Sequence, residues 1–236
     1  MCTNFVRIIG RFLSVRRFSC FVVAMTLMAT FVIQTPASAA YISNTQVEVA
    51  LSKAGYPVGR VNGYFDQYTR RALCMWRDLS GRNINRDYPT PAERVQISQA
   101  VRPVPTRRLA LGLNVSRTCQ ALTWVRQNPT TRARYIQAIY EVSTGMSTHP
   151  TPKGLFKIYS QFNGWQESKL YPGAMMYRPK YFYHGYALHG SATDSLVHTY
   201  PASHGCTRML HRSIDQLWLN KVGIGTQVFI YGDWKG

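Results

Sequence analysis

Two short stretches, residues 186–190 (YALHG) and residues 203–208 (SHGCTR), decide how the C-terminal half of this chain is interpreted. They contain a cysteine, Cys206, that could act as a nucleophile, and a histidine, His189, that could act as its base. An imidazole close in space stabilises a thiolate by forming an ion pair with it. Gly205 permits a sharp turn whose backbone N–H groups can hold an oxyanion, and Arg208 can grip a carboxylate by two contacts. The pattern predicts acyl transfer through a thioester on Cys206.

The segments around these stretches indicate a β-rich domain over residues 109–236. Residues 121–125 and 135–142 are runs of β-branched and aromatic residues separated by Asn and Pro, which predicts a hairpin. Further strands are expected near residues 155–159, 174–177, 186–189 and 227–231. One helix is expected over residues 213–222, where Ser213 and Gln216 have capping-box spacing. The domain is therefore predicted to be a sandwich or a partly closed barrel.

His189-Gly190 and Ser203-His204-Gly205-Cys206-x-Arg208 together resemble the active-site signature of the L,D-transpeptidases. Residues 142–145 (VSTG), 151–156 (TPKGLF) and 185–188 (GYAL) agree with that family, and Thr207 replaces the apolar residue usual after the cysteine. The resemblance implies a β-sandwich with Cys206 as nucleophile and His189 as general base. It implies that the carbonyl of Gly190 is the third member of the triad. The oxyanion- and substrate-binding residues would then be Gly190, Ser203, His204, Gly205 and Arg208.

The resemblance also implies a reaction. The thiolate attacks the carbonyl between a diamino acid and the terminal D-Ala of a tetrapeptide stem, and D-Ala is released. A side-chain amine of a second stem then resolves the thioester into a 3→3 cross-link, by ping-pong covalent catalysis. Carbapenems would acylate the same cysteine, and neither a metal nor an organic cofactor is implied.

Residues 42–100 are predicted to form a small three-helix module. Val47, Ala50, Leu51 and Ala54 fall on one helical face, with Asn44 or Thr45 as the cap and Gly55 after the end. Asp66 can cap a second helix that ends near Gly81, and residues 90–93 (TPAE) have the layout of a capping box that starts a third.

Residues 55–76 of this module resemble the small peptidoglycan-binding repeat of bacterial wall enzymes. The matching pattern is GYPxGxVNGYFDxxTRRALxxW, and Arg77 follows it where that family often has Gln. The resemblance implies that glycan and stem peptides are the partners. Residues 101–108, with two prolines and three arginines, are typical of a stiff extended linker.

The first 39 residues have the features of a secretory signal peptide. Four arginines precede an apolar stretch at residues 18–33, and an Ala-x-Ala site follows at residues 37–39. An uncleaved membrane anchor is the alternative, since about 20 apolar residues span a bilayer. Export would place the protein outside the cytoplasm, associated with the cell wall. It would also leave Cys74, Cys119 and Cys206, which suggests one disulfide and one free thiol, and a Cys74–Cys119 bridge is expected.

The charge agrees with an anionic wall polymer as the partner. The chain has 28 Lys and Arg against 10 Asp and Glu, a net charge of +18, of which the four arginines of the export segment account for +4. A surface with this charge attracts polyanions, and export favours wall polymer over nucleic acid.

Several other interpretations of the same residues are open. Two His and a Cys can bind zinc, but His204-x-Cys206 is tighter than the usual ligand spacing. His184 and His198 are expected to be structural or exposed, and Trp124 and Trp165 are expected in the core. Packing or loop roles are expected for three tyrosines, Tyr177, Tyr181 and Tyr183. A wall-binding protein without activity and a secreted nucleic-acid binder are the competing functions.

Overall fold

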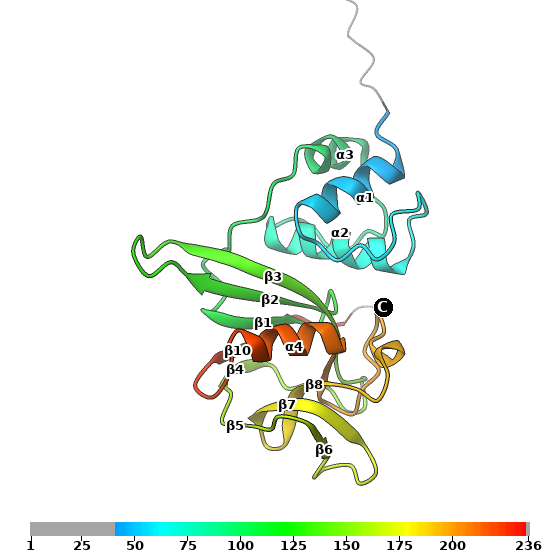
Figure 1. Cartoon of the computed structure of the whole chain (residues 1–236). Helices are drawn as coiled ribbons and strands as arrows, with labels where there is room; N and C mark the ends of the chain where they lie inside the picture. The colour runs from blue at the N-terminus through cyan, green and yellow to red at the C-terminus, as the bar shows by residue number, and fades with distance from the viewer. Residues whose placement is uncertain (1–40, 235–236) are drawn as a thin grey trace, which may run out of the picture. The chain divides into compact units, whose positions relative to one another are not determined.

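Three helices open the described part of the chain, residues 41–234 of the computed structural model (Figure 1). They are α1 (Asn44–Lys53), α2 (Gln67–Leu79) and α3 (Pro91–Ser98). Asp66 caps α2, and Thr90 and Glu93 form the predicted capping box of α3. The cap of α1 is Ser43 rather than Asn44 or Thr45, because its hydroxyl pairs reciprocally with Gln46. The predicted export segment, residues 1–39, lies outside the described residues.

Arg77 is fully buried and organises the connection between α2 and α3. Its guanidinium donates to both carboxylate oxygens of Glu93, at 2.8 and 2.9 Å, and to the carbonyls of Tyr88 and Arg86. These bonds lower the pKa of Glu93 to about 2. The arginine thus ties the irregular residues 82–90 to the start of α3.

A single curled sheet of ten strands makes up the rest of the structure. Its order is β4-β10-β1-β2-β3-β9-β8-β7-β5, with β6 paired to β7. The strands are β1 (Gly112–Ser116), β2 (Ala121–Gln127), β3 (Arg134–Ser143), β4 (Gly154–Lys157), β5 (Ser160–Gln161), β6 (Trp165–Glu167), β7 (Met175–Tyr183), β8 (Tyr186–Gly190), β9 (Thr207–Met209) and β10 (Gln227–Tyr231). The mainly β class and the β2–β3 hairpin are confirmed. The sequence did not predict β1, β5, β6 or β9. One curled sheet takes the place of the two separate sheets of the predicted sandwich.

Apolar side chains from both halves of the sheet meet in one core. Leu113, Leu122 and Val228 come from one half, and Phe182 and Leu188 come from the other. Helix α4 (His211–Leu219) covers this core with Ile214 and Leu217. It begins two residues before the predicted Ser213, and Leu210 supplies no side-chain cap. Asp194 takes over that role, since its carboxylate accepts the backbone N–H of His211 at 2.8 Å.

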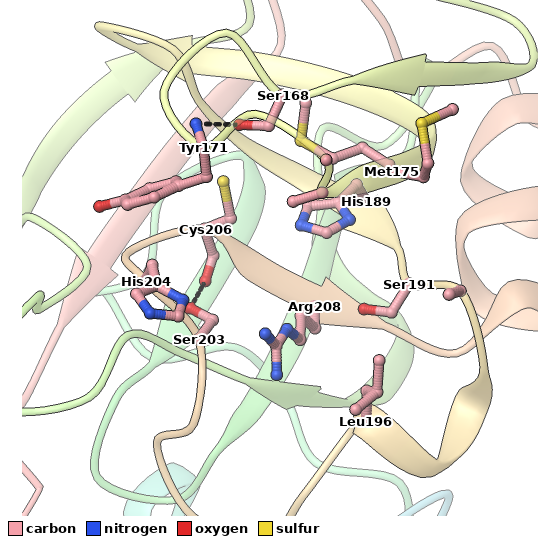
Figure 2. A pocket seen from close by; sticks show the side chains of 14 residues that line it. Ser168, Tyr171, Met175, His189, Ser191, Leu196, Ser203, His204, Cys206 and Arg208 are labelled. Atoms are coloured by element: carbon pink, nitrogen blue, oxygen red, sulfur yellow. Dashed lines mark hydrogen bonds between the residues drawn. The ribbon is translucent and has the colours of Figure 1, made fainter.

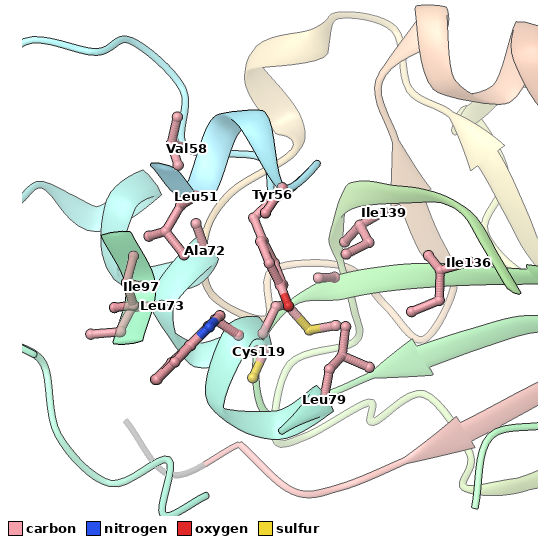
Figure 3. Packing of buried hydrophobic residues seen from close by; sticks show 14 of the residues in the cluster. Leu51, Tyr56, Val58, Ala72, Leu73, Leu79, Ile97, Cys119, Ile136 and Ile139 are labelled. Carbon is pink, nitrogen blue, oxygen red and sulfur yellow. The ribbon is translucent and has the colours of Figure 1, made fainter. Parts of the chain in front are cut away.

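The helices pack directly on the sheet, and residues 40–236 form one compact unit. Leu79 of α2 and Tyr56 share a buried cluster with Ile136 and Ile139 of β3 (Figure 3). A disulfide joins Cys74 of α2 to Cys119 in the turn between β1 and β2. Among the described residues, no helix has the length and apolar character needed to cross a bilayer.

Candidate active site

Cys206 lies at the end of a tight turn, residues 202–206, that leads directly into β9. The hydroxyl of Ser203 donates to the carbonyl of Cys206 and accepts the N–H of Gly205 at 3.1 Å. Gly205 has φ +110°, and a Cβ there would lie 2.1 Å from Cε1 of Tyr186. Only glycine fits this position, so the turn is specified by its own residues.

The neighbouring segments hold the turn from behind. The N–H groups of Ala202 and Ser203 donate to the carbonyl of Thr144, at 2.9 and 3.0 Å. Gly145 approaches the turn so closely that a Cβ on it would lie 2.8 Å from Cα of Gly205. The N–H of Gly145 is in turn bound by the hydroxyl of Thr151 at 2.8 Å. The stretches 142–145 and 151–156, singled out in the sequence, therefore support the catalytic turn.

His189 reaches the same place from β8. Strands β8 and β9 are parallel neighbours, with His189 opposite Arg208 and Leu188 opposite Thr207. Side chains opposite one another on adjacent strands project to the same face of a sheet. Figure 2 shows the side chains of His189, Cys206 and Arg208 around one cavity. The volume of this cavity is about 220 Å³. Register, and not spacing in the sequence, brings the three together.

A backbone carbonyl sets the tautomer of His189. Nδ1 of His189 lies 2.8 Å from the carbonyl oxygen of Gly190. A carbonyl oxygen only accepts, so Nδ1 carries the proton and Nε2 keeps its lone pair. A side chain at Gly190 would collide with the ring of His211, at 2.7 Å from its Cδ2. The structure thus places the Gly190 carbonyl where the third member of the triad was predicted.

Burial favours the neutral forms of both His189 and Cys206. The side chain of His189 is buried, which lowers its pKa to about 4. Burial raises the pKa of the Cys206 thiol, while the N–H of Ala187, 3.4 Å from Sγ, and the charge of Arg208 act in the opposite direction. The expected thiolate–imidazolium ion pair is therefore replaced by a thiol beside a neutral imidazole.

Arg208 and His204 occupy different parts of the site. Arg208 donates to the carbonyl of Ala202 at 3.2 Å and lines the cavity. The ring of His204 contacts the rings of Tyr171 and His149, with centroids 5.0 and 5.4 Å apart. The N–H of Gly205 is already engaged by Ser203, so the observed role of Gly205 is to permit the turn.

The segment after β6 forms a second wall of the cavity, which the sequence did not predict. Tyr171 is held over Cys206 by the hydroxyl of Ser168, which accepts the N–H of Tyr171 at 3.2 Å (Figure 2). Gly173, Met175 and Ser191 also line the cavity. The Pro172-Gly173 pair predicts a turn, which was the only sequence signal for this segment.

The remaining candidates lie outside this cavity. His184 sits in the β7–β8 turn, and His198 stacks on Tyr200, with ring centroids 4.7 Å apart. Within residues 41–234, no three His, Cys, Asp or Glu side chains gather as a metal site. Trp124 is buried as predicted. Trp165 was also expected in the core, but its side chain is 44% exposed. It lies on the short strand β6, which is paired only with β7 in the described sheet, and it contacts the rings of Tyr177 and His211.

The three tyrosines Tyr177, Tyr181 and Tyr183 do not line the cavity. Tyr177 packs between Trp165 and His211, and the hydroxyl of Tyr181 donates to Gln166 at 2.9 Å. Both therefore have structural contacts of the kind that the sequence suggested.

Comparison with solved structures finds similar folds among the L,D-transpeptidases. The L,D-transpeptidase from Xylanimonas cellulosilytica has 29% sequence identity and a TM-score of 0.55, over 80% of this chain and 92% of that one. An L,D-transpeptidase from Stackebrandtia nassauensis has 21% identity and a TM-score of 0.48, over 82% and 92%. L,D-transpeptidase 3 from Mycobacterium tuberculosis, solved with a faropenem-derived adduct, has 17% identity and a TM-score of 0.41, over 52% and 60%.

Comparison with protein families agrees with the geometry of the site. No curated protein matches the chain. The family model of the YkuD L,D-transpeptidase catalytic domain matches residues 112–230, which run from β1 to β10 and contain His189, Cys206 and Arg208. That match covers half of the chain, and the chain belongs to the YkuD family of L,D-transpeptidases.

Proposed function

We propose that this protein is an exported peptidoglycan L,D-transpeptidase that works through an acyl-enzyme on Cys206. The observation that carries the proposal is the shared cavity of Cys206, His189 and Arg208, with the proton of His189 held on Nδ1 by the Gly190 carbonyl. This leaves Nε2 as the base on the side of the nucleophile. Peptidoglycan stem peptides and glycan are the proposed partners, and the chemistry requires no cofactor.

Acylation begins when Nε2 of His189 takes the proton from the Cys206 thiol as the sulfur attacks the carbonyl carbon before the terminal D-Ala. The backbone N–H groups of His204 and Cys206, in the 202–206 turn, hold the resulting oxyanion. The intermediate collapses when the C–N bond breaks and the departing D-Ala nitrogen takes the proton from His189. The product is a thioester between Cys206 and the stem.

Deacylation runs the same steps with an amine as nucleophile. The side-chain amine of a second stem attacks the carbonyl carbon of the thioester. His189 takes a proton from the amine and gives it to the departing sulfur of Cys206. A new amide bond forms, which is the 3→3 cross-link, and Cys206 is regenerated. Arg208 is proposed to bind a carboxylate of the donor stem by a two-pronged contact.

A neutral resting pair suits this sequence of steps. A buried thiol with a raised pKa is protected from unwanted oxidation, since the thiolate is the reactive form. Substrate binding brings the carbonyl within reach, so proton transfer and attack occur together. The N–H of Ala187 and the charge of Arg208 then stabilise the negative charge as it develops on sulfur.

Incubation of the protein with tetrapeptide-bearing muropeptides tests the proposal. Mass spectrometry should detect loss of D-Ala and formation of cross-linked dimers, and Cys206→Ala should abolish both. Circular dichroism of the variant controls for folding. Turnover that persists in Cys206→Ala would refute the nucleophile. Binding of muropeptides without D-Ala release by the unaltered protein would favour the alternative, a wall-binding protein without activity.

Export and the role of the helices belong to the same proposal. The export segment is proposed to direct the protein to the wall, and residues 42–100 are proposed to bind peptidoglycan. Mass determination of the protein recovered from outside the cytoplasm would give the cleavage point. A product that begins at Ala40 is expected.

A further inference from the structure

One face of α2 is turned toward the catalytic domain and lines two cavities. Gln67, Arg70, Arg71 and Cys74 have the spacing of a single helical face. The larger cavity, about 430 Å³, is bounded by all four and by residues 84–87, Thr118 and Trp234. The smaller, about 400 Å³, shares Gln67, Arg71 and Thr199 with it. The hydroxyl of Thr199 donates to Gln67 at 2.9 Å and forms the partition between them.

Arg71 is buried here with unused hydrogen-bond donors. Its side chain is 2% exposed, and its Nη2 donates to Glu141 at 2.9 Å. Its Nε and Nη1 are buried and have no hydrogen-bond partner among the described residues. Buried polar groups are nearly always paired, and an unpaired charged donor is costly. Two unpaired donors on a side chain that lines both cavities therefore point to a ligand that accepts hydrogen bonds.

The charges around Arg71 show which cavity suits an anion. Glu141 in the smaller cavity is already bound on both oxygens, by Arg71 and by Arg212 at 3.0 Å. That cavity also holds the carboxylate of Asp194, which disfavours an anion there. The larger cavity has three arginines, Arg70, Arg71 and Arg86, against the exposed Asp87.

The larger cavity also has an apolar wall formed by Ile84, Trp234 and the Cys74–Cys119 disulfide. A ligand for this site would combine a carboxylate with an aliphatic portion. A stem peptide has both, with free carboxylates along a chain of small aliphatic residues. An inorganic anion would satisfy the arginines alone.

The site is physically linked to the catalytic cavity. Thr199 follows η1 (Asp194–Leu196), and Leu196 lines the catalytic cavity while Asp194 lines the smaller cavity beside Arg71. The segment then continues through Tyr200, whose carbonyl accepts the hydroxyl of Ser143, into the catalytic turn. A peptidoglycan strand bound at Arg71 would therefore lie next to the segment that shapes the catalytic cavity.

We propose that the larger cavity is a second binding site for a carboxylate of a peptidoglycan stem peptide, held by Arg71 with Arg70 and Arg86. The identity of the ligand rests on the proposed function, whereas the anion site itself does not. The site would hold a part of the strand that does not react while Cys206 acts on another.

Calorimetric titration of the full chain carrying Cys206→Ala tests the site without turnover. The probe is a free tetrapeptide stem, with its carboxylate-amidated form and inorganic phosphate as comparators. Arg70→Gln/Arg86→Gln should weaken tetrapeptide binding roughly tenfold, since hydrogen bonds to charged groups are lost. Arg126→Gln/Arg132→Gln changes the net charge equally at exposed positions outside both the cavity and residues 42–100, and should leave binding unchanged.

A second pair of variants tests Arg71 itself. Arg71→Lys keeps a charge opposite Glu141 but removes the guanidinium fork, and should weaken binding by a similar factor. Arg212 also binds Glu141 but lies outside the larger cavity, so Arg212→Lys should leave tetrapeptide binding unchanged. Equal affinity across each matched pair would overturn the site. Equal binding of phosphate and tetrapeptide would overturn the stem-peptide assignment.

Acylation of Cys206 by a carbapenem, measured in the same arginine variants with Cys206 intact, separates this proposal from the previous one. Its rate should be unchanged in the variants, because none of these arginines lines the catalytic cavity. Absence of acylation in the unaltered protein would count against the proposed nucleophile. The calorimetric comparison of the arginine variants would still show whether the larger cavity binds the tetrapeptide.

Discussion

At the scale of single residues, the protonation state of His189 governs the proposed chemistry. The ring is buried on β8, and its hydrogen bond within residues 41–234 is the one from Nδ1 to the carbonyl of Gly190. Burial disfavours the charged form and lowers the pKa of His189 from 6.5 to about 4. Above that pH the imidazole is neutral and Nε2 can accept the thiol proton.

The pH dependence of Cys206 acylation should reflect this shift. Because activity requires neutral His189, the rate should fall as the pH drops through about 4, rather than near the usual 6.5. Stopped-flow measurement of carbapenem acylation from pH 3.5 to 8 would locate this limb, with circular dichroism at each pH as the check on folding. His184 lies outside the cavity, so His184→Asn should not change the pH at which the acylation rate falls. A midpoint near 6.5 would contradict the neutral, buried imidazole.

At the scale of elements, the decisive piece is the 202–206 turn between η1 and β9. It has no regular structure of its own and depends on Ser203, on the carbonyl of Thr144 and on the absence of a side chain at Gly205. Because Cys206 is the last residue of the turn, any displacement of the turn moves the sulfur relative to His189.

Gly205→Ala should therefore impair both folding and acylation. The new methyl would meet Tyr186 at 2.1 Å and adopt φ +110°, costing about 3 kcal/mol from overpacking and strain. Gly225→Ala is the matched control, since Gly225 also has positive φ, but a Cβ there would have no described heavy atom within 4 Å apart from those of its chain neighbours. It should cost about 1–2 kcal/mol and leave acylation unchanged. Urea denaturation measures the loss of stability, and carbapenem acylation measures the reactivity of Cys206. Acylation of Gly205→Ala at the wild-type rate would show that the turn tolerates a side chain.

At the scale of the whole molecule, the helices and the sheet are joined by more than apolar packing. Arg71 binds Glu141 across the junction, and the hydroxyl of Tyr231 donates to Asp78 at 2.7 Å. The Cys74–Cys119 disulfide adds a covalent link over a sequence separation of 45 residues. The junction is thus built to hold α2 beside the catalytic domain.

Removal of the disulfide should lower the free energy of unfolding by about 4 kcal/mol, from the loop entropy that it restricts. Urea denaturation of Cys74→Ser/Cys119→Ser, compared with the parent in a shared Cys206→Ser background, would measure this. The oxidised exported protein should contain one titratable thiol, that of Cys206. Reduction of the bridge should add the thiols of Cys74 and Cys119, which gives three in total. Two or more thiols before reduction would contradict the bridge.

Local sequence was enough to predict much of this protein, because local interactions decide those features. Asp66, the Thr90–Glu93 capping box and the β2–β3 hairpin are near-neighbour effects, and all were predicted. The motif around Cys206 indicated the family for a similar reason, since the tight turn before Cys206 depends on Ser203 and Gly205 within the motif itself. Ser213 was wrongly expected as a cap because Asp194, distant in sequence, caps α4 instead.

Tertiary structure alone decided what depends on partners far apart in the chain. The short strand β9 forms only because β3 and β8 flank it, and its register with β8 sets His189 opposite Arg208. Burial, which no motif encodes, made the thiol and the imidazole a neutral pair. Packing also placed Tyr171 over Cys206, and it left two donors of Arg71 beside a cavity without a hydrogen-bond partner in residues 41–234. The sequence by itself determined which groups can react; the fold decided their protonation, their orientation and the surface around them.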